Sequence, residues 1–266
     1  MSCNPAVQKV ITPELVHRCR EVAATVYKRL RQDVSGRDQP NFARQLALIG
    51  ARANALYVLI GDLVDKGCAN ETRILLRPLI EDCITTWWVC ASKSEGPERL
   101  FSVLFFGRLA AYWAIHGRMK LKDVPSAPWW SDLVKDMQGA ADALNVRFAK
   151  SRDLKDVIEV PHRSEIYELA GSQVDLGALE TAYVDCCSAV HRDGHDLNRY
   201  WLPEPQGRGE VLVDKPYNQP EKNQGEVRVR DFLASTVFIS TINAIANGIG
   251  GKDLKRRRMS HMRVKP

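Results

Sequence analysis

The sequence has seven cysteines but no pair at Cys-x2-Cys spacing. Structural zinc sites with thiolate ligands usually take their cysteines from such pairs, so we expect no zinc site of this kind. The number of cysteines is odd, and most of them fall within helical apolar patterns, which is typical of small buried thiols in a reducing compartment. We therefore expect a cytoplasmic protein without a disulfide framework, a metal centre or a cofactor.

The chain also has little net charge outside its C-terminal end. The formal charge of +6 comes from residues 252–266, which contain seven basic residues and one acidic residue. The rest of the chain is formally neutral, which argues against a broad nucleic-acid-binding face. Within the tail, Lys255, Arg256, Arg257 and Arg258 have the charge needed to bind phosphates of a nucleic acid or an anionic membrane. The alternative is a solvated, flexible terminus.

No basic segment followed by an apolar one is present near the N-terminus, so no secretory signal is expected. One uncharged stretch, Phe232–Gly251, has the length of a membrane span and precedes basic residues. It contains six serine, threonine and asparagine side chains, which are too many for insertion into lipid. We interpret it as a buried core helix and expect no transmembrane span.

The chain does contain long apolar patterns of helical period, and 45% of its residues are hydrophobic. These patterns predict an all-α fold, organised as a bundle-like single domain over residues 1–251 with a basic tail at 252–266. The predicted helices cover residues 12–35, 41–66, 70–92, a segment opening at Pro97, 129–150, 164–170, 179–191 and 229–247.

Residues 192–230 break the helical pattern, because this segment contains four prolines and several glycines. We expect a loop insertion here, before the last helix. Glu210–Val213 and Glu226–Val229 alternate polar and apolar residues with period two, which predicts a small β-hairpin. Long loops within compact domains are usually functional or disordered, so this insertion is a candidate for partner binding.

The most informative motif is Arg73-x3-Arg77-x3-Glu81 in the third predicted helix. Residues four apart lie on one face of a helix, so this motif places three charged groups where core residues are otherwise expected. A second motif, Tyr183-x4-Ser188-x2-His191, ends a later helix. An imidazole on a facing helix can complete a buried network with the arginine and the carboxylate.

With these two motifs, the chain resembles a bacterial all-helical family of unknown function, whose members share an Arg-x3-Glu helix and a later Ser-x2-His helix. The similarity spans about residues 42–191 and the closing helix. The resemblance implies an all-helical fold and implies that Arg77, Glu81, Ser188 and His191 form a site. It implies no reaction.

The motif residues are compatible with three roles. Arg77, Glu81 and His191 have the chemistry for metal-independent RNA cleavage, as in helical nucleases of the HEPN type, although the compact Arg-x4-His motif of those enzymes is absent. A structural ion network that fixes helix register is favoured over catalysis for the same residues, because such networks also perturb titration without doing chemistry. Metal binding by His191, His195 and Glu81 is disfavoured, because Gly194 is expected to end the helix and turn His195 away.

The sequence therefore predicts a helical interaction or accessory protein of a prokaryotic stress, defence or mobile-element system. Its partner is expected to be a nucleic acid or a protein, bound through the basic tail and the 192–230 insertion, and homo-oligomerisation is compatible with the pattern. The enzymatic alternative is a HEPN-like ribonuclease that uses His191, Arg77 and Glu81. The sequence leaves open whether the protein is an enzyme.

Overall fold

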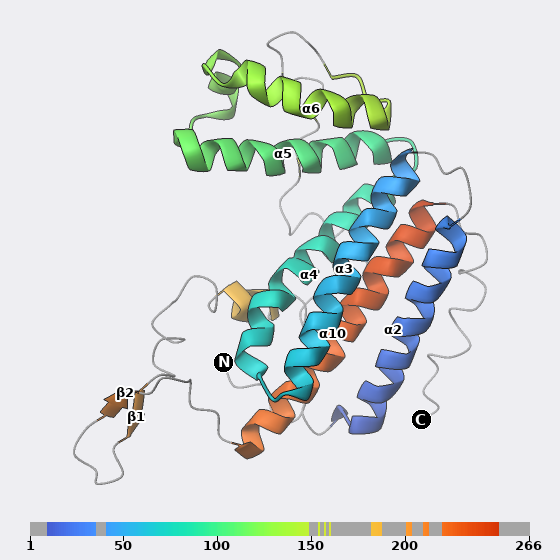
Figure 1. Ribbon diagram of the computed structural model, residues 1–266, viewed down its shortest axis with the longest axis vertical. Helices are drawn as coiled ribbons and strands as arrows, with labels where there is room; N and C mark the ends of the chain where they lie inside the picture. Colours follow the sequence, from blue (N-terminus) through green and yellow to red (C-terminus); the bar gives the residue numbers. More distant parts are fainter. Residues whose placement is uncertain are drawn as a thin grey trace. The chain divides into compact units, whose positions relative to one another are not determined.

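The computed structural model is all-α in its body, as the apolar pattern predicts (Figure 1). It describes residues 10–35, 41–148, 154, 157, 160, 182–187, 201–203, 210–212 and 220–249. The helices are α2 (Pro13–Val34), α3 (Asn41–Asp65), α4 (Ala69–Ala91), α5 (Gly96–His116), the short 3-10 helix η1 (Leu121–Ser126), α6 (Trp130–Leu144) and α10 (Pro220–Gly248).

The chain divides into two compact units. The first contains residues 1–32, 49–83 and 172–243, and the second contains residues 33–48, 84–171 and 244–266. Helices α3, α4 and α10 contribute residues to both units, and the last two residues of α2 belong to the second unit. The single helical domain over residues 1–251 stays a prediction.

The first unit is built from α2 and parts of α3, α4 and α10, which run side by side (Figure 1). Phe238 of α10 lies at its centre, stacked on Tyr57 of α3 with ring centroids 4.6 Å apart. Tyr27 of α2 packs against the same ring at 5.9 Å. The hydroxyl of Tyr57 is 3.0 Å from that of Ser235, so the polar end of this ring is satisfied as well. Aromatic packing thus joins three helices.

An ion-pair network joins the same three helices about two turns away. Arg20 of α2 donates to Asp231 of α10 at 2.8 Å and to Asp65 of α3 at 2.8 Å. The side chain of Asp231 is only 5% exposed, whereas that of Asp65 is 62% exposed. Burial raises the pKa of Asp231, although the hydrogen bond from Arg20 acts in the opposite direction. The buried carboxylate therefore depends on Arg20 for its charge.

A tight turn links α3 to α4 in this unit. Gly67 has a φ of +72°, a left-handed conformation that favours glycine. The amide of Cys68 donates to the carbonyl of Leu63 at 2.8 Å, and that of Gly67 to Val64 at 2.9 Å. This C-terminal cap reverses the chain, so α4 runs antiparallel to α3.

The second unit contains the pair α5 and α6, which is held by an aromatic core. Phe105 of α5 contacts Phe148 at 5.9 Å and Trp130 of α6 at 6.5 Å between ring centroids. On the outer side, Asp136 accepts from Tyr112 at 3.0 Å and from Arg108. The predicted opening of a helix at Pro97 is confirmed, because α5 begins at Gly96.

The predicted pairing of Glu210–Val213 with Glu226–Val229 is wrong, because residues 226–229 lie within α10. Strand β2 (Glu210–Leu212) pairs instead with β1 (Trp201–Pro203), antiparallel and with Trp201 opposite Leu212. A run of four residues with alternating polarity does not distinguish a strand from one turn of a helix. Residues 220–230 of the predicted 192–230 insertion belong to α10, and its remaining residues other than β1 and β2 lie outside the described residues.

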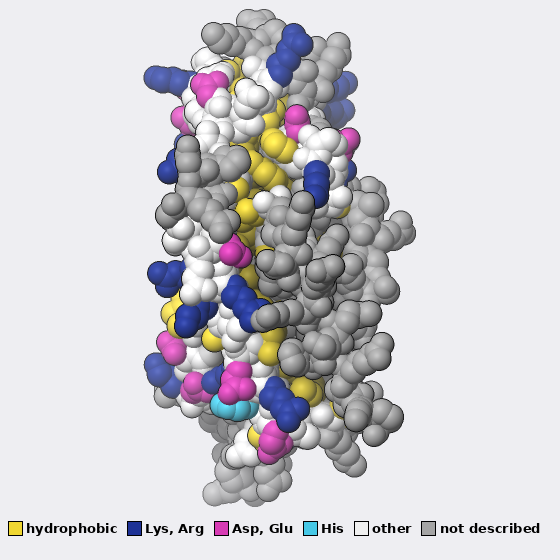
Figure 2. Space-filling model, turned by 90° about the vertical axis from the view of Figure 1, so that its right-hand side faces the viewer, with side chains coloured by type: hydrophobic (Ala, Val, Ile, Leu, Met, Phe, Trp, Pro, Cys, Tyr) yellow, Lys and Arg dark blue, Asp and Glu magenta, His cyan; other side chains and the backbone are white. Residues whose placement is uncertain are grey.

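The surface of the described residues carries charges of both signs. On the face that Figure 2 shows, Lys and Arg side chains are interspersed with Asp and Glu, and hydrophobic side chains run between them. Two helical stretches, α3 and residues Gln224–Gly248 of α10, are long and apolar enough to cross a membrane by length and composition, which are properties that core helices share. The apolar window of α10 is 67% buried, but that of α3 is only 22% buried.

Removal of Arg20 is expected to destabilise the protein far more than removal of its exposed partner. Arg20→Gln leaves the buried Asp231 without its cation, which we expect to cost about 3 kcal/mol in the free energy of unfolding. Asp65→Asn removes an exposed ion pair and is expected to cost less than about 1 kcal/mol. Urea denaturation followed by circular dichroism measures both values, and equal losses would contradict this assignment.

Candidate functional site

The charged motif of α4 faces a short helical segment at 182–187. Arg73, Arg77 and Glu81 are spaced four residues apart, so α4 presents all three on one face. Arg73 and Glu81 both contact the 182–187 segment. These residues, with their partners on 182–187 and α10, are called the Arg/Glu cluster below.

Arg73 is the most deeply buried charge of the Arg/Glu cluster, with a side chain that is only 2% exposed. Its Nε lies 2.9 Å from Oδ2 of Asp185, and its Nη2 donates to the backbone carbonyl of the same residue. Arg230 of α10 approaches the same carboxylate oxygen at 4.0 Å and is 3.4 Å from Glu226, one turn earlier in α10. Asp185 thus accepts from α4 and faces a second cation on α10.

Arg77, Glu81 and Tyr183 form the more accessible half of the cluster. Nε of Arg77 is 3.2 Å from Oε1 of Glu81, and the hydroxyl of Tyr183 donates to the same oxygen at 2.9 Å. The guanidinium of Arg77 lies over the Tyr183 ring, 5.7 Å from its centroid. Burial lowers the pKa of Arg77, whereas the hydrogen bond to Glu81 and the nearby Tyr183 and Cys187 raise it. The net result is a raised pKa.

Asp82 lies beside Glu81 on α4 and has an unusual protonation equilibrium. Burial raises its pKa to about 6, and the charge of Glu81 acts in the same direction. Arg52 of α3, at 3.2 Å, opposes this shift only in part. The pKa of Asp82 therefore lies well above that of an ordinary aspartate, a shift that functional sites and structural ion-pair networks both produce.

The two adjacent cysteines differ in environment. Cys186 is 1% exposed, and burial together with Asp185 raises the pKa of its thiol to about 12. A thiol with such a pKa is protonated at neutral pH, so it is not an activated nucleophile. Cys187 is partly exposed and lies close enough to Arg77 to affect its pKa.

The structure brings together two of the four nominated catalytic residues, Arg77 and Glu81, and adds Tyr183 as their partner. Ser188 and His191 lie outside the described residues, as do His195 and the nominated nucleic-acid-binding residues Lys255–Arg258. Among the residues described, no group of three or more His, Cys, Asp or Glu side chains is arranged to hold a metal ion.

Three members of the cluster were missed by sequence reasoning: Asp185, Glu226 and Arg230. Glu226 and Arg230 are four residues apart, which is the spacing of an ion pair on one face of a helix. This signal was hidden because Glu226 was assigned to a strand and not to the helix that contains Arg230. Asp185 had no signal of its own, since its role depends on the tertiary contact with Arg73.

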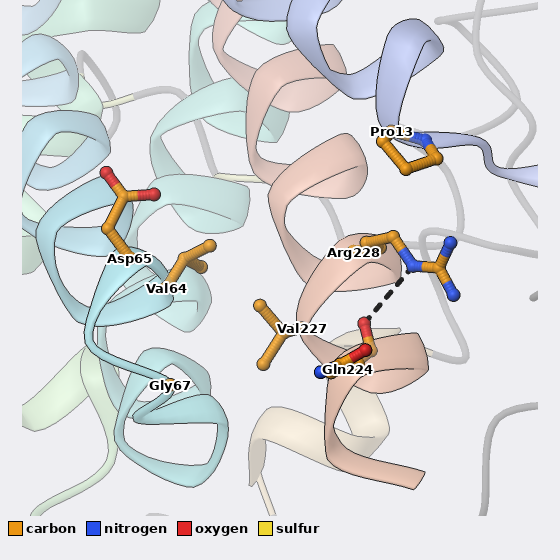
Figure 3. Close-up of a pocket in the computed structure, with 7 residues that line it drawn as sticks. All are labelled: Pro13, Val64, Asp65, Gly67, Gln224, Val227 and Arg228. Atoms are coloured by element: carbon orange, nitrogen blue, oxygen red, sulfur yellow. Dashed lines mark hydrogen bonds between the residues drawn. The ribbon is translucent and has the colours of Figure 1, made fainter. Parts of the chain in front are cut away.

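A shallow pocket of about 400 Å³ lies apart from the cluster, where the start of α2 meets the end of α3 and the first turns of α10 (Figure 3). Val64 and Val227 lie between Asp65 on α3 and Arg228 on α10. Pro13, Gly67 and Gln224 complete the lining, and Arg228 donates to the carbonyl of Gln224 at 3.3 Å. Asp65 is already bound to Arg20, and the lining includes no nucleophile, so this pocket offers no evident chemistry.

Comparison with protein-family models, with curated proteins and with solved structures found no significant match. The description of the protein therefore rests on its own geometry. The fold and the cluster define a class, namely all-helical bundle proteins with a partly buried network of paired charges.

Replacement of Asp82 is expected to change the pH dependence of stability. Because the folded protein raises the pKa of Asp82 from 3.8 to about 6, ionisation of this group opposes folding. The cost is absent below about pH 4, grows as the pH rises, and reaches at most about 3 kcal/mol above pH 6. Asp82→Asn avoids this cost, so its stability relative to the wild type is expected to increase between pH 4 and pH 7.

Chemical denaturation at a series of pH values measures this difference directly. A difference that stays constant with pH, or that falls as the pH rises, would contradict the raised pKa of Asp82.

Proposed function

We propose that this protein is a helical interaction or accessory protein that associates with nucleic acid through its basic tail. The observation that carries the proposal is the location of the charge. The whole formal charge of +6 belongs to residues 252–266, on a body that is formally neutral. The resemblance to a bacterial helical family is the reason for assigning it to a prokaryotic stress, defence or mobile-element system.

The Arg/Glu cluster supports a scaffolding role for the body. Arg73 of α4 and Arg230 of α10 converge on Asp185 of the 182–187 segment. Buried charges that are paired in this way fix the register of the elements that carry them, and they do no chemistry while they are engaged with each other. A helical body with a concentrated basic tail is suited to holding a polyanion beside other proteins.

The mixed charges of the body support the same conclusion. On the face of Figure 2 the described basic side chains are interspersed with acidic ones, so no broad basic surface competes with the tail there. Four consecutive cations, Lys255–Arg258, release several counterions on binding phosphates, which makes the affinity strongly salt-dependent.

Neutralising the tail is expected to weaken RNA binding and flatten its salt dependence. A variant with Lys255, Arg256, Arg257 and Arg258 all changed to Gln loses four phosphate contacts. For a single strand, the slope of log K against log salt concentration should therefore become less steep by up to about 3. Fluorescence anisotropy of a labelled single-stranded RNA, titrated with the full chain at several salt concentrations, measures both quantities.

The matched control removes the same charge from α2. Arg18, Lys28, Arg29 and Arg31 are all exposed, and their replacement by Gln gives the same net charge as the tail variant. The control should retain most of the wild-type affinity. Equal losses in the two variants would show that net charge alone matters, and no binding by the wild type would remove the proposal.

A ribonuclease of HEPN-like type is the second candidate, and one observation favours it. The side chains of Arg77 and Glu81 are 21% and 38% exposed, and both contact Tyr183 on the segment that precedes Ser188 and His191 in sequence. Solvent access to an arginine and a carboxylate beside a nearby histidine is a requirement for acid–base cleavage of RNA.

This candidate predicts that the purified protein cleaves a mixed RNA pool in the presence of a chelator and that His191→Ala abolishes the cleavage. The control is His17→Ala, because His17 is an exposed residue of α2 that belongs to no proposed site. Circular dichroism establishes that each variant is folded. Cleavage that survives in His191→Ala, or that is absent from the wild type, would eliminate the nuclease.

A further inference from the structure

Helix α3 carries two seams on opposite sides, of which the second is apolar except for one charged residue at each end. One seam faces the interior, and its members are buried or partly buried: Ala43, Leu46, Gly50, Ala53, Tyr57, Ile60 and Val64. The other seam faces solvent, and its members are all exposed: Arg44, Leu48, Ala51, Ala55, Val58 and Asp62. Both sets alternate steps of three and four residues, which is the heptad spacing of coiled coils. We call the second set the outer seam.

The outer seam has the composition of a helix-packing surface. Leu48 is 62% exposed and Val58 is 51% exposed, while Leu59 beside them is 51% exposed. Ala51 and Ala55 occupy its middle, where small side chains allow the backbone of another helix to approach closely. Only 22% of the most apolar stretch of α3 is buried. Exposed apolar rows of this kind mark interaction sites on protein surfaces.

The outer seam is self-complementary when two copies of α3 run antiparallel to each other. If a second α3 runs antiparallel and is centred on residue 53, Arg44 faces Asp62 of the second copy. In the same register, Leu48 faces Val58 and Ala51 faces Ala55. Each of these three pairs then occurs twice, so large residues pack on large ones, small residues on small ones, and an ion pair closes each end. Such a self-complementary surface is the requirement for a two-fold interface.

We propose that the outer seam pairs α3 with α3 of a second copy of this chain, as an antiparallel two-helix coiled coil. Charge complementarity selects this occupant. A parallel pair would set Arg44 against Arg44 and Asp62 against Asp62, which is unfavourable at both ends. Within the described residues, Arg44 and Asp62 have no other ion-pair partner.

A lipid bilayer is a poorer occupant of the same face. Arg44 and Asp62 are members of the seam itself, and Arg52 near the middle of α3 is 64% exposed and paired with Asp82. Charged side chains at these positions would be buried in the hydrocarbon, at considerable cost. The same charges are favourable at the ends and rim of a protein interface, where they select the partner and its orientation.

The outer seam covers nearly three heptads, a length of about 27 Å at 1.5 Å per residue. An interface of this size with alanine at its centre lies at the small end of stable protein contacts, so the dimer is expected to dissociate in the micromolar range. The inference does not depend on the proposed association with nucleic acid.

Sedimentation velocity of the full chain, without nucleic acid, tests the proposal over micromolar concentrations. The wild type should shift from monomer to dimer as its concentration rises. Val58→Glu places a carboxylate in the outer seam and should abolish the shift. The control, Ile115→Glu, changes a residue of α5 that is 77% exposed and lies off the seam, and it should dimerise as the wild type does.

Charge exchange identifies the antiparallel register. Arg44→Asp and Asp62→Arg should each weaken self-association about 10-fold, because each creates two like-charged contacts in a two-fold pair. A mixture of the two single variants should dimerise as well as the wild type, since every facing pair is then of opposite charge. The double variant Arg44→Asp/Asp62→Arg should also recover.

Circular dichroism and thermal unfolding, recorded on each variant as monomer, establish that these exposed substitutions leave the fold intact. A wild type that stays monomeric at every concentration, or a dimer that Val58→Glu leaves unchanged, would overturn the proposal. Failure of the mixture to associate would overturn the antiparallel register.

Discussion

The buried ion pair between Arg73 and Asp185 is the interaction on which the Arg/Glu cluster depends. A guanidinium in the interior cannot be deprotonated, so its charge must be matched by an acid placed beside it. Asp185 provides that match and also faces Arg230. One carboxylate therefore ties the segment at 182–187 to α4 and brings it beside α10, and the position of Tyr183 on Glu81 follows from this attachment.

The helical body could be predicted from the sequence because its apolar residues recur with the period of a helix over long stretches. The bounds of α3 and α4 differ from the prediction by at most one residue at either end. The start of α10 was misplaced by nine residues, because a short alternating run was given the period of a strand. A period can be read with least certainty from a run of only a few residues.

Only the contacts of the candidate site that lie within α4 could be predicted from the sequence. The spacing of Arg77 and Glu81 indicates their hydrogen bond, since residues four apart on a helix are neighbours. The partner of Arg73 was not predictable, because Asp185 lies 112 residues away in sequence. The second cation that faces Asp185, Arg230, comes from yet another helix. The raised pKa of Asp82 has the same origin, because burial by the surrounding fold is its main cause and no sequence pattern reports it.

The central claim is that Arg73 and Asp185 form a structural lock. A double-mutant cycle of the free energy of unfolding, with Arg73→Met, Asp185→Leu and the double variant, tests it most directly. Asp185→Leu leaves the buried Arg73 without its main partner and should cost about 3 kcal/mol. Arg73→Met should cost less, because Asp185 is 23% exposed and still faces Arg230. The double variant removes both charges and should be more stable than Asp185→Leu by about 2 kcal/mol. Losses that add in the double variant would contradict the lock.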